Sequence, residues 1–295
     1  MKAIAALSLT LLALAKEAAA ACDCGFRDPA TDSLWTDAII TYFNETGAAQ
    51  SIVSNPERSA DRYGQDDAGS SGNGQQPWVA SQRTNDWEDD FGATWRSAVS
   101  FNNTYFSNDS SSTGLHMQVS PADTVNRISY GSQLVSRRRD ILFGSFQAFV
   151  KPSTPVSAGT TFDMEVAYNQ SELIRSAIFS ADAWGDGTLQ YSFSARNMDA
   201  AASYNFSKLD ATFANISART YDFRQYRMDW LPRSIVFSND GTNATSNKFA
   251  AHKDANTNLP SVGGPWSFKH WSNGSPTESQ GPPIYHEAVA KVLWA

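Results

Sequence analysis

The sequence predicts an all-β protein in which short antiparallel strands form a sandwich or a barrel. Three observations support this fold class. Apolar and polar residues alternate in several segments, helical periodicity is weak throughout, and turns rich in Gly, Pro, Asn and Ser separate the segments. Many short strands between such turns are typical of two packed sheets.

The first element is an N-terminal leader. Residues 1–21 combine one lysine, a short apolar run and a stretch of alanines, which is the pattern of a secretory signal peptide. The apolar run is shorter than the roughly 20 residues that cross a bilayer. We therefore expect cleavage near Cys22, no membrane span and no lipid anchor. A buried N-terminal helix is the lesser alternative.

Eight Asn-x-Ser/Thr sequons are also consistent with export. In a secreted eukaryotic protein such asparagines accept glycans, and we expect them on exposed loops. The sequons are at Asn44, Asn102, Asn108, Asn169, Asn205, Asn215, Asn243 and Asn273. The sequence thus predicts a secreted, extracellular glycoprotein.

Residues 22–84 are predicted to form an irregular N-terminal extension, with one apolar patch at 34–43. Residues 59–76 are rich in Gly, Ser, Asp and Gln, and we expect a flexible surface loop there. Cys22 and Cys24 could pair with each other or with another chain. Two cysteines at one end cannot staple the fold, so a large apolar core must hold it.

The pattern becomes strand-like after residue 114. In 160–168 the apolar face carries Phe162, Met164, Val166 and Tyr168, and the other face carries Thr161, Asp163, Glu165 and Ala167. The predicted strands are 115–119, 141–150, 160–168, 172–179, 189–193, 226–230, 235–237 and 288–294.

The formal net charge of −7 argues against a nucleic-acid partner, which needs clustered Lys and Arg. The one basic run, Arg137–Arg139, is followed by Asp140 and is typical of a solvated or salt-bridged strand edge. The four histidines lack the spacing of metal ligands, and no nucleophile elbow or phosphate-binding loop is present. We expect neither a cofactor nor a metal ion, although Asp182 and Asp186 flank a loop that could hold calcium.

Several segments resemble glycoside hydrolase family 16, in the concanavalin A-like lectin/glucanase superfamily. Residues 221–230, followed by 235–237 and Asp240-Gly241, are similar to that family's aromatic strand and the hairpin after it. Residues 143–152 resemble the strand that enters its catalytic region, and 270–274, with Gly281-Pro282-Pro283 beyond, resemble segments near the C-terminal end of fungal members. The resemblance covers roughly residues 85–295. It implies a two-sheet β-jelly roll with an open cleft, acting on β-glucan or a related cell-wall polymer.

Members of that family carry Glu-x-Asp-x-Glu on a cleft strand, where the first Glu is the nucleophile, the Asp supports it and the last Glu is the acid/base. This sequence has no intact copy. In one register the motif falls on 161–165, with Thr at the nucleophile position. In the other register it falls on 172–176, which keeps only the first Glu. We favour the second register.

Asp163, Glu165 and Glu172 would restore the trio if 160–168 and 172–179 are neighbouring strands and share the cleft face. Glu172 is then the nucleophile, Glu165 the acid/base and Asp163 the supporting residue. Close carboxyl groups would have pKa values driven apart, as acid/base work requires. The alternative is that Asp163 and Glu165 are solvent-facing strand residues.

Four tryptophans are candidates for stacking on sugar rings: Trp87, Trp184, Trp266 and Trp271. We favour Trp184 and Trp271 because their surroundings are rich in Gly, Asp or Asn. The leading function is a secreted glycoside hydrolase or transglycosylase acting on cell-wall polysaccharide as a monomer. The alternative is a non-catalytic, lectin-like wall protein. A polysaccharide lyase, with Tyr168 and Arg175 in the cleft, is a third option.

Overall fold

The computed structural model describes a set of separate segments of the chain. They are residues 25–29, 31–44, 52–59, 77–84, 93–106, 113–153, 159–169, 172–180, 188–196, 206–213, 222–240, 247–252, 258–275, 279 and 281–295. The chain divides into two compact units, Met1–Ile39 and Ile40–Ala295. The first unit contains an antiparallel hairpin of β1 (Phe26–Asp28) and β2 (Ser33–Trp35). In this hairpin the Arg27 guanidinium pairs with Asp32.

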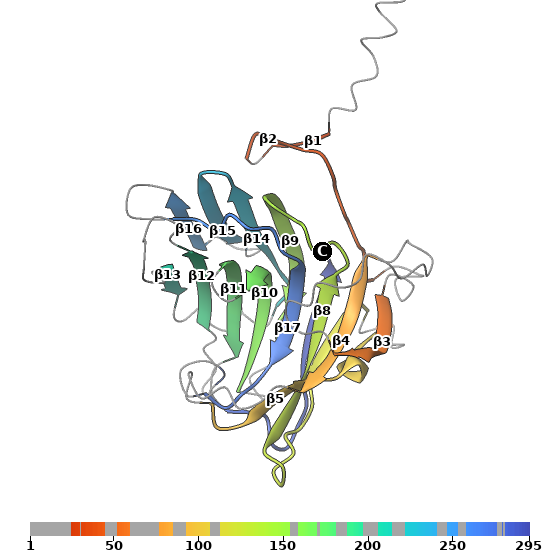
Figure 1. Cartoon of the computed structure of the whole chain (residues 1–295). Helices are drawn as coiled ribbons and strands as arrows, with labels where there is room; N and C mark the ends of the chain where they lie inside the picture. The colour runs from red at the N-terminus through yellow and green to blue at the C-terminus, as the bar shows by residue number, and fades with distance from the viewer. Residues whose placement is uncertain are drawn as a thin grey trace, which may run out of the picture. The chain divides into compact units, whose positions relative to one another are not determined.

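The second unit is a sandwich of two β-sheets (Figure 1). The nine-stranded sheet has the order β13-β12-β11-β10-β17-β8-β5-β4-β3. Its strands are β3 (Ile52–Ser59), β4 (Trp78–Thr84), β5 (Arg96–Val99), β8 (Ile128–Ser136), β10 (Thr160–Asn169), β11 (Glu172–Ser180), β12 (Thr188–Arg196), β13 (Phe206–Phe213) and β17 (Trp266–Trp271).

The seven-stranded sheet has the order β16-β15-β14-β9-β18-β7-β6. Its strands are β6 (Thr104–Phe106), β7 (Leu115–Val119), β9 (Gly144–Lys151), β14 (Arg224–Leu231), β15 (Ser234–Asp240), β16 (Asn247–His252) and β18 (Ala288–Trp294). Most pairs are antiparallel, while β3–β4 and β5–β8 are parallel. In the described residues the helical structure is a single turn, η3 (Phe101–Asn103). The all-β sandwich is therefore confirmed.

The core lies between the two sheets and is rich in aromatic side chains. The ring of Trp78 on β4 lies 5.2 Å from that of Trp266 and 5.6 Å from that of Phe268, measured between centroids. Trp266 is therefore a core residue, not a surface platform for sugars. Burying one large apolar side chain stabilises a fold by about 1.5–3 kcal/mol, so these aromatic contacts are a main source of stability.

The sheets begin earlier in the chain than the sequence pattern indicates. β3 and β4 belong to the nine-stranded sheet, and both precede the domain boundary expected at residue 85. Phe43 is also fully buried in the core, and its amide donates to the carbonyl of Leu293. The compact unit starts at Ile40 because these early segments bury apolar side chains.

Tyr168 does not continue the apolar face of its strand. The pairing of β10 with β11 shifts between Ala167 and Asn169, and Tyr168 lies at this irregularity with 45% of its surface exposed. An extra residue in one strand rotates the side chains that follow it, which explains the departure from simple alternation.

Candidate functional site

The side chains of β10 divide between two faces of the nine-stranded sheet. Phe162, Met164 and Val166 belong to the core, so Asp163 and Glu165 point the other way. We call this side of the sheet, turned away from the core, the outer face. Residues directly opposite each other on paired strands share a face, so the strand register assigns the neighbours on it.

Three strands contribute charged or aromatic residues to the centre of the outer face. Asp163 on β10 is opposite Lys269 on β17, and Glu165 is opposite Arg175 on β11. Trp271 follows Lys269 on the same face of β17. We call these five residues the outer-face cluster.

The carboxylate of Asp163 is held on both oxygens. Arg175 donates from Nε to Oδ1 at 3.0 Å and from Nη2 to Oδ2 at 3.2 Å. The indole Nε1 of Trp271 also donates to Oδ2, at 2.7 Å. Asp163 is only 2% exposed. A buried carboxylate in a two-pronged ion pair is a fixed anion that holds the neighbouring strands together, and its lone pairs are committed.

Glu165 is the carboxylate of the cluster with access to solvent. It is half-buried, and its Oε1 accepts a hydrogen bond of 3.2 Å from the hydroxyl of Ser267. Lys269 is buried, and its Nζ lies 4.4 Å from the ring centroid of Trp271, which is a cation–π geometry. Two acidic and two basic side chains therefore balance one another within the cluster.

Glu172 does not join the cluster. Its Oε2 accepts a hydrogen bond of 2.9 Å from the amide of Ser261, and the side chain is buried. Ile174, two residues later, belongs to the core, so alternation turns Leu173 and Arg175 toward the outer face instead. The structure therefore does not assemble the expected trio of Asp163, Glu165 and Glu172. Glu172 lies two residues before Ile174 on the same strand, so it takes the core side of β11.

The structure places the predicted sugar-binding residues in different environments. Trp271 and Arg175 do lie on the outer face, but Trp271 is 4% exposed and both are bound to Asp163. Tyr168 is exposed at the end of β10. Trp87 and Trp184 lie outside the described residues, as do Asp182 and Asp186, so the calcium hypothesis stays a prediction. Within the described segments, no three His, Cys, Asp or Glu side chains come together as metal ligands.

Sequence reasoning missed Ser267 and Lys269, which β17 places on the outer face. The segment from Ser267 to Trp271 alternates polar outward residues with Phe268 and His270, which point inward. That alternation was the available signal, although the whole strand is buried and its aromatic residues obscure the period.

The outer face also has a half-buried part, which includes Glu165 and Arg175 of the outer-face cluster. Its members are side chains on β8, β10, β11 and β12 that keep partial exposure, and we call them the half-buried strip. They are Val135, Glu165, Ala167, Leu173, Arg175, Gln190 and Ser192. Glu165, Arg175, Gln190 and Ser192 are polar and Val135, Ala167 and Leu173 are apolar, so the strip can offer both hydrogen bonds and apolar contact.

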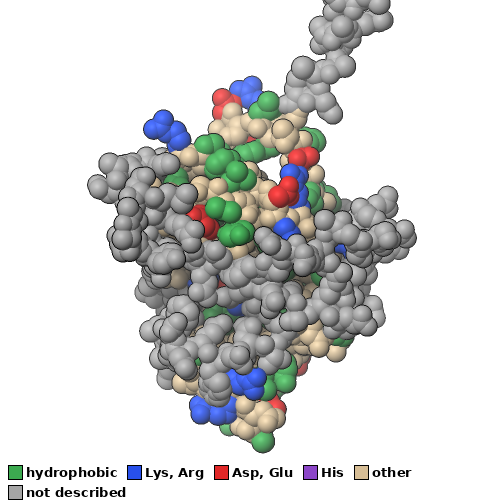
Figure 2. Space-filling model, in the orientation of Figure 1, with side chains coloured by type: hydrophobic (Ala, Val, Ile, Leu, Met, Phe, Trp, Pro, Cys, Tyr) green, Lys and Arg blue, Asp and Glu red, His purple; other side chains and the backbone are tan. Residues whose placement is uncertain are grey.

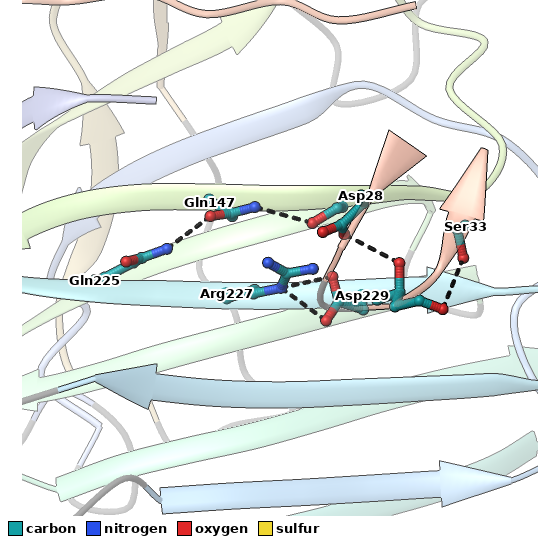
Figure 3. Close-up of polar contacts among 8 residues, drawn as sticks. Asp28, Ser33, Gln147, Gln225, Arg227 and Asp229 are labelled. Carbon is teal, nitrogen blue, oxygen red and sulfur yellow. Dashed lines mark hydrogen bonds and ion pairs between the residues drawn. The ribbon is translucent and has the colours of Figure 1, made fainter. Parts of the chain in front are cut away.

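The outward side of the seven-stranded sheet carries a separate polar group (Figure 3). Gln225 donates from Nε2 to Oε1 of Gln147 at 2.6 Å, across the β9–β14 pair. Arg227 donates from Nε to both oxygens of Asp229 at 2.8 Å. The carboxylate of Asp229 is thus bound to a guanidinium, as that of Asp163 is.

The described sequons differ in exposure. Asn44 and Asn102 are exposed. Asn273 is completely buried, and its Oδ1 accepts hydrogen bonds from the Ser275 amide at 2.9 Å and the Ser279 hydroxyl at 3.0 Å. A folded chain has no room for a glycan there, so the expected exposure fails at Asn273. The side chain of Asn169 and the sequons at Asn108, Asn205, Asn215 and Asn243 lie outside the described residues.

The described segments contain no helix with the length and apolar character that crossing a membrane requires.

No protein-family model and no curated protein matches the chain. Solved structures do share its fold. One is a prokaryotic β-1,3-1,4-glucanase (lichenase) from a mouse hindgut metagenome, with a TM-score of 0.52 and 14% identity over 74% of this chain and 91% of that one. Another is a family 16 glycoside hydrolase from Bacteroides ovatus, with a TM-score of 0.52 and 13% identity over 74% of this chain and 93% of that one.

A third is the catalytic domain of an endo-1,3-β-glucanase (laminarinase) from Thermotoga petrophila, with a TM-score of 0.52 and 10% identity over 74% of this chain and 89% of that one. The TM-scores show a common architecture, and identities this low leave the activity open. The sandwich therefore has the two-sheet jelly-roll fold of the family 16 glucanases.

Proposed function

We propose that this chain binds a polysaccharide of the β-glucan type on the outer face of its nine-stranded sheet, without hydrolysing it. The observation that carries the proposal is the state of Asp163, whose carboxylate is buried and held by Arg175 and Trp271. The fold supports a carbohydrate ligand, because the similar solved structures are glucanases.

Glycoside hydrolysis needs two carboxyl groups that flank the bond to be cleaved. Their separation is about 5–5.5 Å in retaining enzymes and about 6.5–9.5 Å in inverting ones. Here Glu172 faces away from the outer face, and the carboxylate of Asp163 is paired with Arg175. Glu165 is therefore the member of the proposed trio that keeps solvent access. One accessible carboxylate can bind a sugar hydroxyl but cannot supply both the acid and the base.

The half-buried strip supports binding. Glu165 and Arg175 offer an acceptor and a donor for sugar hydroxyls, and Ser192 lies opposite Arg175 on the next strand. Leu173 and Ala167 are opposite each other and provide an apolar surface beside these groups. Pyranose rings expose hydroxyls at their rims and C–H groups on their faces, so a mixed surface of this kind suits them.

A glycoside hydrolase or transglycosylase is the second candidate, and one observation favours it. Asp163 and Glu165 lie two residues apart on one face of β10, which separates their Cα atoms by about 7 Å. That spacing is compatible with the carboxyl separation of an inverting enzyme. Catalysis would require Arg175 to release Asp163.

Export is also part of the proposal. We infer a secreted wall protein that acts as a monomer; the leader at residues 1–21 and the sequons support export, and the resemblance of residues 270–274 to fungal members supports a fungal type. The exposure of Asn44 and Asn102 is compatible with glycosylation at these two positions. Intact-mass analysis of the secreted chain before and after glycan removal would count the occupied sites. Occupancy at Asn273 would contradict the folded structure.

The test incubates the purified chain with β-1,3-glucan, mixed-linkage glucan and chitin-type polymers, and measures both retention and new products. We expect retention on one polymer without oligosaccharide release. Glu165→Gln should weaken retention, whereas Glu287→Gln, at an exposed site on another segment, serves as the matched control. Oligosaccharides that are released by the native chain and lost in Glu165→Gln or Glu172→Gln would establish the hydrolase instead. If the chain is retained on none of the polymers and releases no products, both candidates are rejected.

A further inference from the structure

One end of the sandwich brings together several segments that are far apart in the sequence. β8 and β10 end there, and β9 and β17 begin there. The amide of Gly264 donates to the carbonyl of Ile141 at 3.1 Å, and the amide of Ala167 donates to that of Pro265 at 3.3 Å. A Cβ atom on Gly264 would lie 2.5 Å from the backbone of Ala167, so these segments are in direct contact.

The described residues at this end include a run of basic side chains. Arg137, Arg138 and Arg139 are all exposed, as is Asp140. Arg138 pairs with Asp140 at 3.0 Å. The four residues Arg137 to Asp140, three arginines and one aspartate, carry a formal charge of +2 on a chain whose net charge is −7. A local charge of opposite sign to the whole molecule is a feature that selects a partner.

Large apolar side chains are exposed beside these arginines. Leu142 and Tyr168 are each 45% exposed, and Val262 is 40% exposed. The Ile141–Gly264 bridge and the contact of Gly264 with Ala167 place these three residues on adjoining segments. Figure 2 shows hydrophobic, basic and acidic side chains interspersed on the described surface. We call Arg137 to Leu142, Tyr168 and Val262 the arginine end.

The arginine end continues the outer face of the nine-stranded sheet. On β8, Gln133 and Val135 are opposite outer-face residues of β17, and Arg137 is the next position in the same alternation. On β10, Tyr168 follows Glu165 and Ala167 of the half-buried strip. A linear chain bound along the strip would therefore leave the sheet over the arginines.

We propose that the ligand is an anionic polysaccharide and that the arginine end binds its acidic groups. This inference rests on the proposed function and adds the substrate class. A guanidinium matches a carboxylate or sulfate with two parallel hydrogen bonds. Tyr168 and Leu142 provide apolar contact for the sugar rings between those charges. A neutral glucan would use the strip and leave the arginines solvated.

The experiment compares two polymers with one backbone, laminarin and carboxymethylated laminarin, by titration with the full chain at low and high salt. We expect the carboxymethylated polymer to bind at least about tenfold more tightly at low salt, with the advantage lost in about 1 M NaCl. The Arg137→Gln/Arg139→Gln double variant should lose the advantage. Lys151→Gln/Lys291→Gln is the matched control, because it removes two positive charges from the seven-stranded sheet.

Each of the other outcomes contradicts one part of the proposal. Equal binding of both polymers, or an arginine variant that behaves as the control does, would overturn the anionic assignment and leave the proposed function standing. Binding of neither polymer would reject the proposed function itself. Equal, arginine-dependent binding of polyglutamate would overturn the polysaccharide in favour of an acidic protein partner. Circular dichroism of each variant checks that the substitutions leave the fold intact.

Discussion

His270 is fully buried on the inner face of β17, and its hydrogen bonds determine its tautomer. Nδ1 lies 2.8 Å from the carbonyl of Met117, which can only accept, so Nδ1 carries the proton. Nε2 therefore accepts from the hydroxyl of Thr160 at 3.1 Å. That hydroxyl in turn accepts from Ser153 at 3.1 Å. The neutral ring is thus built into a directed chain of hydrogen bonds.

Burial lowers the pKa of His270 from 6.5 to about 4. The unfolded chain binds the proton more readily, so the contribution of His270 to stability is complete above pH 6.5 and is lost as the pH falls toward 4. The loss amounts to about 3 kcal/mol. Urea unfolding at pH 7 and pH 4.5 measures most of this loss. A His270→Gln variant should show a smaller difference between the two pH values, and an unchanged difference would contradict the prediction.

A diagonal ion pair links β10 with β11. Arg175 is directly opposite Glu165, yet its guanidinium binds Asp163. The side chains of Arg175 and Asp163 are 14% and 3% exposed, so removing one partner leaves the other charge buried. Such a loss costs about 3–5 kcal/mol, which is a large part of the stability of a domain.

A double-mutant cycle tests this pair. Arg175→Gln should lower the free energy of unfolding by about 3 kcal/mol, because the carboxylate of Asp163 then keeps only the bond from Trp271. Asp163→Asn retains an acceptor for that bond. The double variant should be more stable than the sum of the single effects predicts, by about 1–3 kcal/mol. Additive effects in urea titrations would show that the two residues do not act as a unit.

The same pair of strands shows what the sequence could and could not predict. Alternation over 160–168 correctly assigned Phe162 to the core and Asp163 to the opposite face. It could not assign Glu172, because the face of a β11 residue depends on how β11 pairs with β10, and alternation within 160–168 does not give that register. The cluster also depends on Lys269, which lies 106 positions after Asp163 and meets it only through the order of the strands.

On the scale of the whole unit, the beginning and the end of the compact fold are joined. The backbones of Thr41 and Ala295 exchange two hydrogen bonds, of 2.7 Å and 3.0 Å. The indole of Trp78 donates to the hydroxyl of Thr41 at 2.9 Å. Phe43 packs with its ring centroid 6.2 Å from that of Trp78. The composition of residues 22–84 did not indicate that they contribute to the core, since isolated aromatic residues in a polar stretch give no periodic signal.

These contacts predict that the fold tolerates deletion of residues 1–39 and not of residues 1–84. The longer deletion removes β3, β4 and the buried rings of Phe43 and Trp78. Losing a buried aromatic side chain costs about 3–5 kcal/mol, and total stability is about 5–15 kcal/mol. Chains 40–295 and 85–295 would be compared by thermal unfolding and near-ultraviolet circular dichroism. We expect a cooperative transition for the first only. A cooperative transition of chain 85–295 would place the boundary where the sequence suggested it and assign β3 and β4 a peripheral role.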